Sequence, residues 1–323
     1  TLTNIVEPDV TSGGTIQPEV IDTDYKYLAF PYTVANAYPK LAADSTNLKA
    51  WYKFDDANNL GLNSATSAIT IGNATINGEP TIDSSEYKVG SSSYFSGAGD
   101  DDALIIDSNS NKLYTHLNQK PISISFWCKS VSGGQNNFGR IFCGAPSGSP
   151  ATYNSIQCVH WQSNQLKFII SNNNEYYTNN EIITTTMPAF NTAWSHIVCV
   201  IIPTSTNWTA KTHTIKIYIN GVLNVSSASF YYPKITENYD FQIGRWTTTD
   251  ESREYDGYLD DFRIYDKALS KDEITQLYNI QDQTEYSVTF DEPDGTECDI
   301  LIVGGGGSGG TYIGGGGGAG GVL

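Results

Sequence analysis

The chain repeats one pattern, in which short runs of alternating apolar and polar residues are separated by turn residues. In the stretch ISISFW, the isoleucines and Phe126 fall on one face of a strand, and the serines and Trp127 fall on the other. In HTIKIYINGVLNV, a second run of this kind turns at Asn220-Gly221, a pair that supports the positive φ angles of a tight type I′ turn. WSHIVCVII and QLKFII are more apolar, as expected of buried strands. The pattern predicts an all-β fold, a two-sheet antiparallel sandwich or jelly roll.

The hydrophobic period changes near the end of this region, within GYLDDFRIYDKALSKDEITQLYN. Ser270 and Glu273 form the S-x-x-E pattern of a capping box, which marks the first turn of a helix. Ile274, Leu277 and Tyr278 then recur at helical spacing. We therefore expect the last strand to run into a short C-terminal helix that covers the sandwich.

Composition divides the chain into three expected parts. Residues 1–47 form an N-terminal extension or linker with one or two strands, of which YKYLAF is the best candidate. Residues 48–280 form the jelly roll. Residues 281–323 begin a glycine-rich domain, in which two strands flank a turn at Pro293-Asp294-Gly295 before the glycine run. The chain reads as a piece of a longer protein, with no signal peptide and no apolar stretch long enough to insert into a membrane.

The charge of the chain bears on its partners. Lys and Arg number 18 and Asp and Glu number 35, which gives a net charge of −17. Such a surface repels phosphate backbones and argues against a nucleic-acid partner. It suits solubility and divalent cations.

The five cysteines form no C-x-x-C pair, and their odd number argues against a complete disulfide framework. Cys143 and Cys158 could face each other across a hairpin and form a disulfide. The other interpretation, which we favour, is that these residues are buried free thiols.

Six stretches resemble, in the family's order, the laminin G-like and concanavalin A-like lectin jelly roll. They are LKAWYKFDDANNLGLNSA, YFSGAGDDDALII, ISISFWCK, NTAWSHIVCVI, IKIYINGVL and FQIGRWTTTDESREYDGYLDDFRIYDKALSKDEITQLYN. The resemblance covers about residues 48–279 and implies the same two-sheet fold.

The resemblance also implies a structural calcium ion between the opening segment and the strand that carries two adjacent aspartates. The ligands carried over are Asp55, Asn63, Asp260 and Asp261. Carboxylates, amides, carbonyls and water together supply the six to eight oxygens that calcium needs. Asn63 departs from the family, whose members commonly have aspartate there, and an amide would weaken binding. The alternative is that the acidic pair only fixes the end of the strand by hydrogen bonds.

The residues argue against catalysis. No strand shows the alternating carboxylates with which jelly-roll glycanases flank a glycosidic bond. The four histidines have no metal-ligand spacing, and no serine lies in a G-x-S-x-G elbow. ILIVGGGGSGG is followed by more glycine instead of a helix, so it does not fit a dinucleotide site. It resembles instead the glycine-rich domains of virion fibre and adhesin proteins.

Two functions are compatible with this pattern. The first is a non-catalytic adhesion module on an extracellular or virion surface, which binds glycans through exposed aromatic faces. Its candidate binding residues are Trp246, Trp161, Tyr176 and Tyr177. The alternative is a structural fibre or capsid-decoration subunit, which works through protein–protein contacts and forms homo-oligomers through its flanking segments.

Overall fold

The structure is a computed structural model, in which the chain divides into two compact units, residues 1–33 with 284–323 and residues 34–283. It describes residues 27–31, 38–67, 71–97, 99–106, 113–134, 138–146, 155–161, 165–171, 181–184, 193–207, 210–233, 235, 238–246, 253–279 and 286–290. The domain boundaries expected at 47/48 and 280/281 stay predictions.

In the first unit, strand β1 (Tyr27–Pro31) pairs antiparallel with strand β17 (Tyr286–Phe290). β1 lies in the predicted YKYLAF strand. The glycine run and the turn expected at Pro293-Asp294-Gly295 lie outside the described residues. Two segments from opposite ends of the sequence thus share one small sheet.

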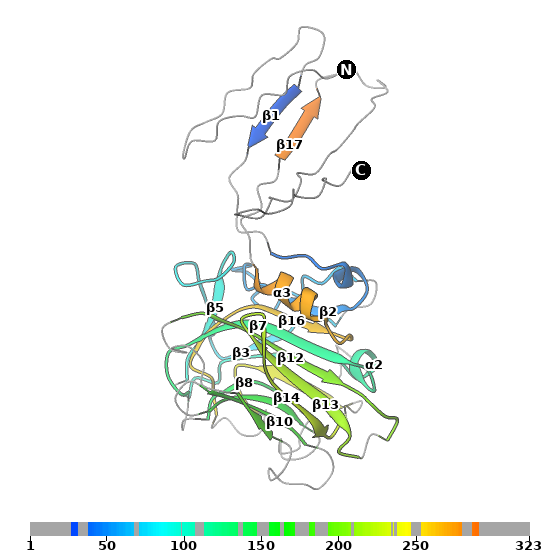
Figure 1. The fold of residues 1–323 in the computed structure, drawn as a ribbon. Coiled ribbons are helices and arrows are strands. Elements are labelled where there is room, and N and C mark those ends of the chain that lie inside the picture. The colour runs from blue at the N-terminus through cyan, green and yellow to red at the C-terminus, as the bar shows by residue number, and fades with distance from the viewer. Residues whose placement is uncertain are drawn as a thin grey trace, which may run out of the picture. The chain divides into compact units, whose positions relative to one another are not determined.

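The second unit is the predicted sandwich, and its described strands form two antiparallel sheets (Figure 1). The seven-stranded sheet has the order β11-β10-β9-β8-β15-β6-β3, with strands Glu181–Ile183, Gln165–Ile170, Ile156–Trp161, Arg140–Pro146, Tyr239–Ile243, Ala103–Ile106 and Thr75–Asn77. The eight-stranded sheet has the order β14-β13-β12-β7-β16-β5-β4, with strands Val222–Phe230, His213–Ile219, Ser195–Ile202, Ile122–Ser130, Gly257–Tyr265, Ser92–Phe95 and Thr81–Asp83. Its remaining strand, β2 (Leu48–Tyr52), also pairs with β16.

The main core lies between the two sheets, and aromatic residues hold its centre. Phe126 of β7 stacks on Phe262 of β16 with ring centroids 5.5 Å apart. Phe142 of β8 stacks on Phe241 of β15 at 5.3 Å. Because alternate residues of a strand point to opposite faces, the isoleucines of β7 share this core with Phe126, as the alternation predicts.

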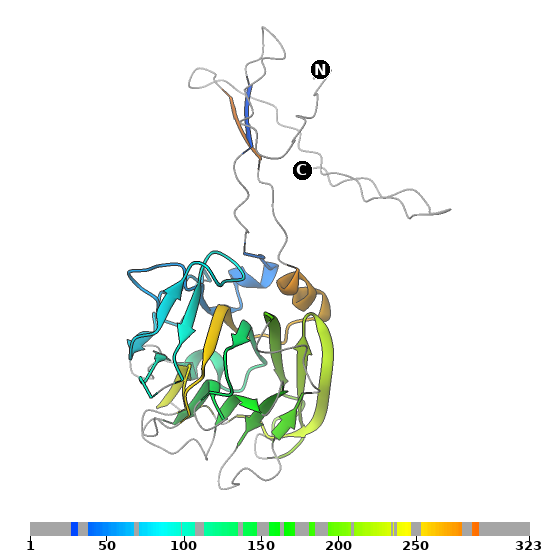
Figure 2. The ribbon, with the colours of Figure 1, turned by 90° about the vertical axis from the view of Figure 1, so that its left-hand side faces the viewer.

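The outer face of the eight-stranded sheet is covered by helix α3 (Lys271–Tyr278) and the 3₁₀ turn η1 (Ala42–Ser45), both seen beside the sandwich in Figure 2. Ser270 and Glu273 form the predicted capping box, with Ser270 N donating to Glu273 Oε2 at 2.8 Å. The buried side chains of Ile274 and Leu277 pack against the sheet. A further short helix, α2, spans Leu113–Leu117.

Two local predictions are confirmed. The turn at Asn220-Gly221 has φ angles of 50° and 76°, both positive as a type I′ turn requires. The four cysteines in the described part, Cys128, Cys143, Cys158 and Cys199, are buried free thiols, and Cys298 lies outside it. Cys143 pairs with Gln157, not with Cys158, in the register of β8 and β9, so a Cys143–Cys158 disulfide does not form.

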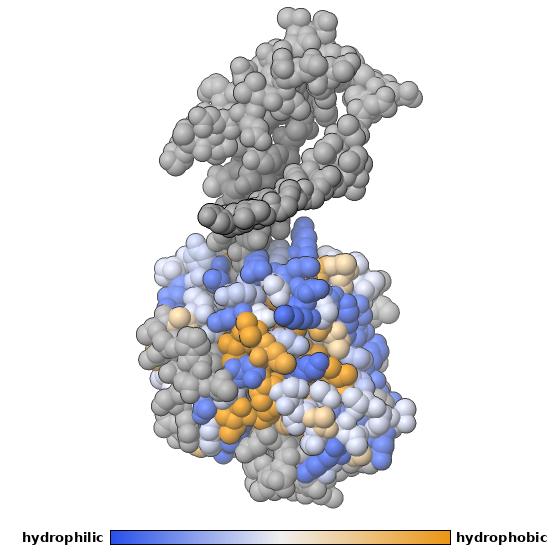
Figure 3. Space-filling view, viewed as in Figure 1, coloured by the Kyte–Doolittle hydropathy of each residue, from blue (hydrophilic) through white to orange (hydrophobic). Residues whose placement is uncertain are grey.

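The described surface is mixed in polarity. Figure 3 shows apolar residues gathered in the middle of one face, with hydrophilic residues around them. No helix in the described ranges is long and apolar enough to cross a membrane.

Candidate functional site

The two adjacent aspartates lie at a β-bulge in β16. The register between β16 and β7 shifts between Asp260 and Arg263, and Asp261 has a φ of 49°. Aspartate tolerates this left-handed conformation better than most residues. β5 pairs with β16 only as far as Leu259, and the pairing of β2 with β16 begins at Phe262. The bulge therefore occupies the gap between two partner strands, and the side chains of both aspartates are buried there.

Asp260 anchors the chain that crosses this gap. Its Oδ2 accepts hydrogen bonds of 2.8 Å from the backbone N–H groups of both Lys88 and Val89. Its Oδ1 is buried and has no hydrogen-bond partner in the part of the chain that the structure describes. Burial raises the pKa of Asp260 well above its ordinary value. The carboxyl group is thus held in place with one oxygen unused.

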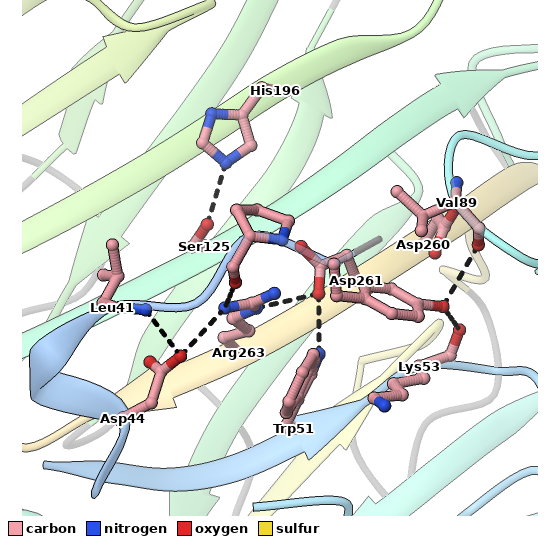
Figure 4. Close-up of polar contacts among 12 residues, drawn as sticks. Leu41, Asp44, Trp51, Lys53, Val89, Ser125, His196, Asp260, Asp261 and Arg263 are labelled. Atoms are coloured by element: carbon pink, nitrogen blue, oxygen red, sulfur yellow. Dashed lines mark hydrogen bonds and ion pairs between the residues drawn. The ribbon is translucent and has the colours of Figure 1, made fainter. Parts of the chain in front are cut away.

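Asp261 forms a buried ion pair with Arg263 (Figure 4). Its Oδ1 lies 2.8 Å from Arg263 Nε and accepts a 2.6 Å hydrogen bond from Trp51 Nε1. The Arg263 guanidinium lies 4.2 Å from the Trp51 ring centre and donates to the carbonyl of Pro39 at 2.8 Å. These contacts match the interpretation in which the acidic pair fixes the strand by hydrogen bonds.

Asn63 has a structural position. Its Oδ1 accepts from the backbone N–H groups of Trp51 and Ala65 at 2.8 and 3.0 Å, and its Nδ2 donates to the carbonyls of Lys49 and Ile71. The amide therefore ties three segments of the opening region together. A metal ion would have to break these bonds, so we leave Asn63 out of the proposed ligand set.

Three acceptor oxygens lie within hydrogen-bond distance of the Tyr38 hydroxyl. The hydroxyl lies 2.9 Å from Asp55 Oδ2 and 3.1 Å from the carbonyls of Lys53 and Val89. A phenol has one hydrogen to donate, so it cannot satisfy all three acceptors at once. Burial and the nearby carboxylate of Asp260 raise the pKa of Tyr38. This neighbourhood is rich in oxygen and negative charge.

Calcium prefers oxygen ligands, and carboxylates and backbone carbonyls like these are among the commonest. Asp55 Oδ2, the unused Oδ1 of Asp260 and the two carbonyls near Tyr38 are oxygens of the types that such an ion binds. Within the described ranges, no group of three or more His, Cys, Asp or Glu side chains lies close enough to hold a metal by itself. Backbone carbonyls would therefore have to complete the site.

A second cluster lies at strands β8, β9 and β10 of the seven-stranded sheet, where cations contact aromatic rings. We define the cation–aromatic row as Lys167, Trp161, Phe138, Arg253, Trp246 and Arg140. β10, β9 and β8 are neighbours in the sheet, and the segment at Glu254 bridges to Arg140 beside them. The row therefore collects residues from strands and loops that are far apart in the sequence.

Each member of the row contacts the next. Lys167 Nζ lies 3.3 Å from the Trp161 ring centre, and the Trp161 and Phe138 centroids are 5.1 Å apart. The Arg253 guanidinium lies 5.7 Å from the Phe138 ring and 4.3 Å from the Trp246 ring. Arg140 lies 5.4 Å from Trp246 on the same row. Cation–π attraction stabilises these contacts and is stronger where water is partly excluded, and the Trp161 and Phe138 rings are tilted by 52° relative to each other.

The predicted aromatic platforms differ in their exposure. Trp246 is only 7% exposed and packs on Cys143 and Ala145, so it forms the base of the row. Trp161 is partly exposed, and Tyr176 and Tyr177 lie outside the described residues. Phe138, at 36%, is the most exposed ring of the row.

The sequence reading missed four members of the row, Phe138, Arg140, Lys167 and Arg253. A usable signal was present, because basic residues are scarce in this acidic chain and these lie near aromatic residues. It also missed Arg263, which repeats the strand period of Asp261 and Tyr265 on one face.

A family model described as the concanavalin A-like lectin/glucanases superfamily matches residues 97–275 of the chain. No curated protein sequence matches it.

Solved structures share the fold at low sequence identity. Domain 4 of AbnA, an extracellular arabinanase from Geobacillus stearothermophilus, solved with arabinotriose, is 20% identical with a TM-score of 0.51, and the match covers 73% of this chain and all of that domain. The binding domain of botulinum neurotoxin serotype D is 17% identical with a TM-score of 0.51, over 75% of this chain and 53% of the toxin domain. A botulinum neurotoxin DC binding domain, solved with rat synaptotagmin II, is 19% identical with a TM-score of 0.51, over 74% of this chain and 53% of that one. The chain thus spans about half the length of these toxin domains.

Proposed function

Because the chain belongs to the concanavalin A-like lectin/glucanases superfamily, we propose that it is a non-catalytic surface module that binds glycans through the cation–aromatic row. The observation that carries this proposal is the unbroken run of contacts from Lys167 to Arg140. Sugar sites combine ring faces for the apolar side of a sugar with a few polar groups that fix its orientation. Phe138 and Trp161 offer the faces, and Arg253, the partly exposed cation of the row, offers the polar group, since Arg140 and Lys167 are buried.

The charge of the row supports a binding role over hydrolysis. A glycosidase places two carboxylates on either side of the scissile bond, and one of them acts as an acid. The side chains that form the row are aromatic or basic. The solved structures bind arabinotriose in one case and synaptotagmin in another, which agrees with a module that contacts glycans or surface proteins. We place the module on an extracellular or virion surface, as part of a larger protein.

A glycan array probed with the whole chain tests this function, and binding should be lost in both Phe138→Ala and Trp161→Ala. Each variant removes a ring face that is exposed enough to contact a sugar. Tyr87→Ala is the matched control, because Tyr87 is 40% exposed and lies outside the row. Glycan binding that survives both row variants, or glycan cleavage by the chain, would contradict the proposal.

We also propose that a calcium ion binds beside Tyr38, held by Asp55, Asp260 and the carbonyls of Lys53 and Val89. Two observations support it: the unused buried oxygen of Asp260, and the three acceptors that share one phenol hydrogen. In this position, calcium would neutralise the buried carboxylate of Asp260 and join the loop at Val89 to the opening segment.

The second candidate, a structural subunit, is favoured by the edge of the eight-stranded sheet. Val222 and Leu223 at the start of β14 are 68% and 48% exposed. Exposed apolar residues on an edge strand favour pairing with another chain. Self-association of the whole chain that is removed by Val222→Lys, without any glycan binding, would select this candidate.

A further inference from the structure

The guanidinium of Arg253 differs from those of the other arginines in the described part of the chain. Arg263 pairs with Asp261, and Arg245 donates to Gln242 and lies 3.8 Å from Asp101 Oδ1. Arg140 donates to the side chain of Gln157 and to the carbonyl of Phe138; its own N–H donates to the Arg253 carbonyl. Arg253 is partly exposed, and among the described residues its guanidinium contacts aromatic rings alone.

The surroundings of Arg253 restrict the position of its guanidinium and leave its N–H donors available to a ligand. Its backbone is fixed, since the Arg253 carbonyl accepts a 3.0 Å hydrogen bond from Arg140 N. Its side chain lies against Phe138 and Trp246, which restricts the guanidinium without using its N–H donors. A stacked guanidinium keeps five donors in a rigid fork, and these match the two oxygens of a carboxylate.

We propose that Arg253 makes the row select sugars that carry a carboxylate group. This inference rests on the proposed glycan-binding function and names the class of glycan. The sugar ring would lie on the exposed faces of Phe138 and Trp161, and its carboxylate would accept two hydrogen bonds from Arg253. Charge-assisted pairs of this kind are roughly twice as strong as neutral ones.

The net negative charge of the chain restricts the attraction of an acidic glycan to the region around the row. The net charge of −17 repels an acidic glycan at long range, so attraction must come from a cation close to the ligand. Arg140, Arg253 and Lys167 lie together in the row. Arg253 is partly exposed whereas Arg140 and Lys167 are buried, so Arg253 is the cation of the row that a ligand can reach.

Calorimetric titration of the whole chain tests the proposal with pairs of probes that differ only in charge. The pairs are oligogalacturonate and its methyl ester, oligomannuronate and its methyl ester, and sialyllactose and its methyl ester. A sulfated galactan oligomer serves as an anion of different shape. The variants are Arg253→Gln, Arg253→Lys and the control Lys271→Gln, which removes the same charge from the exposed surface of α3.

We expect at least one acidic probe to bind about tenfold or more tightly than its neutral partner, as one charged bidentate pair provides. Arg253→Gln should remove this difference, Arg253→Lys should restore part of it, and Lys271→Gln should leave it unchanged. Equal affinity within every pair, selectivity that survives Arg253→Gln, or equally tight binding of the sulfated probe would overturn the proposal. Neutral glycans that bind and depend on Phe138 would then leave the glycan-binding function intact. Failure of all glycans to bind would overturn both.

Discussion

At the scale of single residues, we expect the buried polar side chains of the eight-stranded sheet to govern how the stability of the chain depends on pH and on calcium. The pair of adjacent aspartates is visible in the sequence, but the bulge that turns both inward is set by where β5 and β2 end. Arg263 was not predicted because its surroundings, the Trp51 ring and the Pro39 carbonyl, come from segments far away in the sequence. A prediction from alternation assumes a regular strand, and a bulge changes which side chains face the core.

His196 is the residue through which acid should destabilise the fold. It is fully buried, its Nε2 lies 2.9 Å from Ser125 Oγ, and its ring packs on Trp127. Burial lowers the pKa of His196 to about 3, from 6.5 in the unfolded chain. Between these two values the unfolded chain binds more protons, so stability falls as the pH falls below 6.5, by up to about 1.4 kcal/mol per pH unit.

The variant His196→Phe keeps an aromatic ring and removes the titration. Urea unfolding between pH 4 and pH 7 should show that its stability depends less steeply on pH than that of the wild-type chain. Other groups titrate in both proteins, so the difference between the two curves isolates His196. Parallel curves would contradict the assignment.

Calcium should raise the melting temperature of the chain, because an ion that binds the folded state alone stabilises it. Thermal unfolding in calcium chloride should therefore give a higher Tm than in a chelator. Asp260→Asn should abolish this difference, since it removes a charge from the proposed site. Asp83→Asn, at a partly exposed position whose carboxylate accepts hydrogen bonds from the Ser85 and Glu86 N–H groups, should keep it. If the wild-type chain has the same Tm in calcium chloride and in the chelator, the proposed calcium site is wrong.

At the scale of elements, the strands, the type I′ turn and the capped helix could be predicted because each depends on neighbours in the sequence. The alternation that buries Phe126 and the box at Ser270 are both local signals. Pairing between distant strands has no such signal. The partnership of β1 with β17 joins two ends of the chain, and composition had assigned them to different parts.

Helix α3 contributes to stability through its cap as well as its buried face. Glu273 N donates to Ser270 Oγ at 3.2 Å, and Ser270→Ala removes this acceptor. The expected loss is about 1 kcal/mol in the free energy of unfolding, measured with urea. Ser84→Ala, at an exposed position outside any helix, should change stability little. Equal effects of the two substitutions would show that the cap is not needed to hold α3 on the sheet.

At the scale of the whole molecule, the sequence predicted two tryptophans of the cation–aromatic row but none of its cations. Trp161 and Trp246 were predicted as platforms, and both belong to the row. Phe138 and Arg253 come from other segments, and the fold alone places them between the two tryptophans. Trp246 proved to be the base of the row because its ring is buried against Cys143 and Ala145.

Hydrogen–deuterium exchange of the whole chain, with and without a glycan that the array identifies, tests most directly whether the row is the binding surface. We predict slower exchange in the ligand-bound chain at residues 138–146, 155–161 and 253–255, which carry or adjoin the row. Exchange at β14, an edge strand of the other sheet that carries no residue of the row, should stay unchanged. Protection confined to β14 or to the flanking unit, with none at the row, would contradict the account.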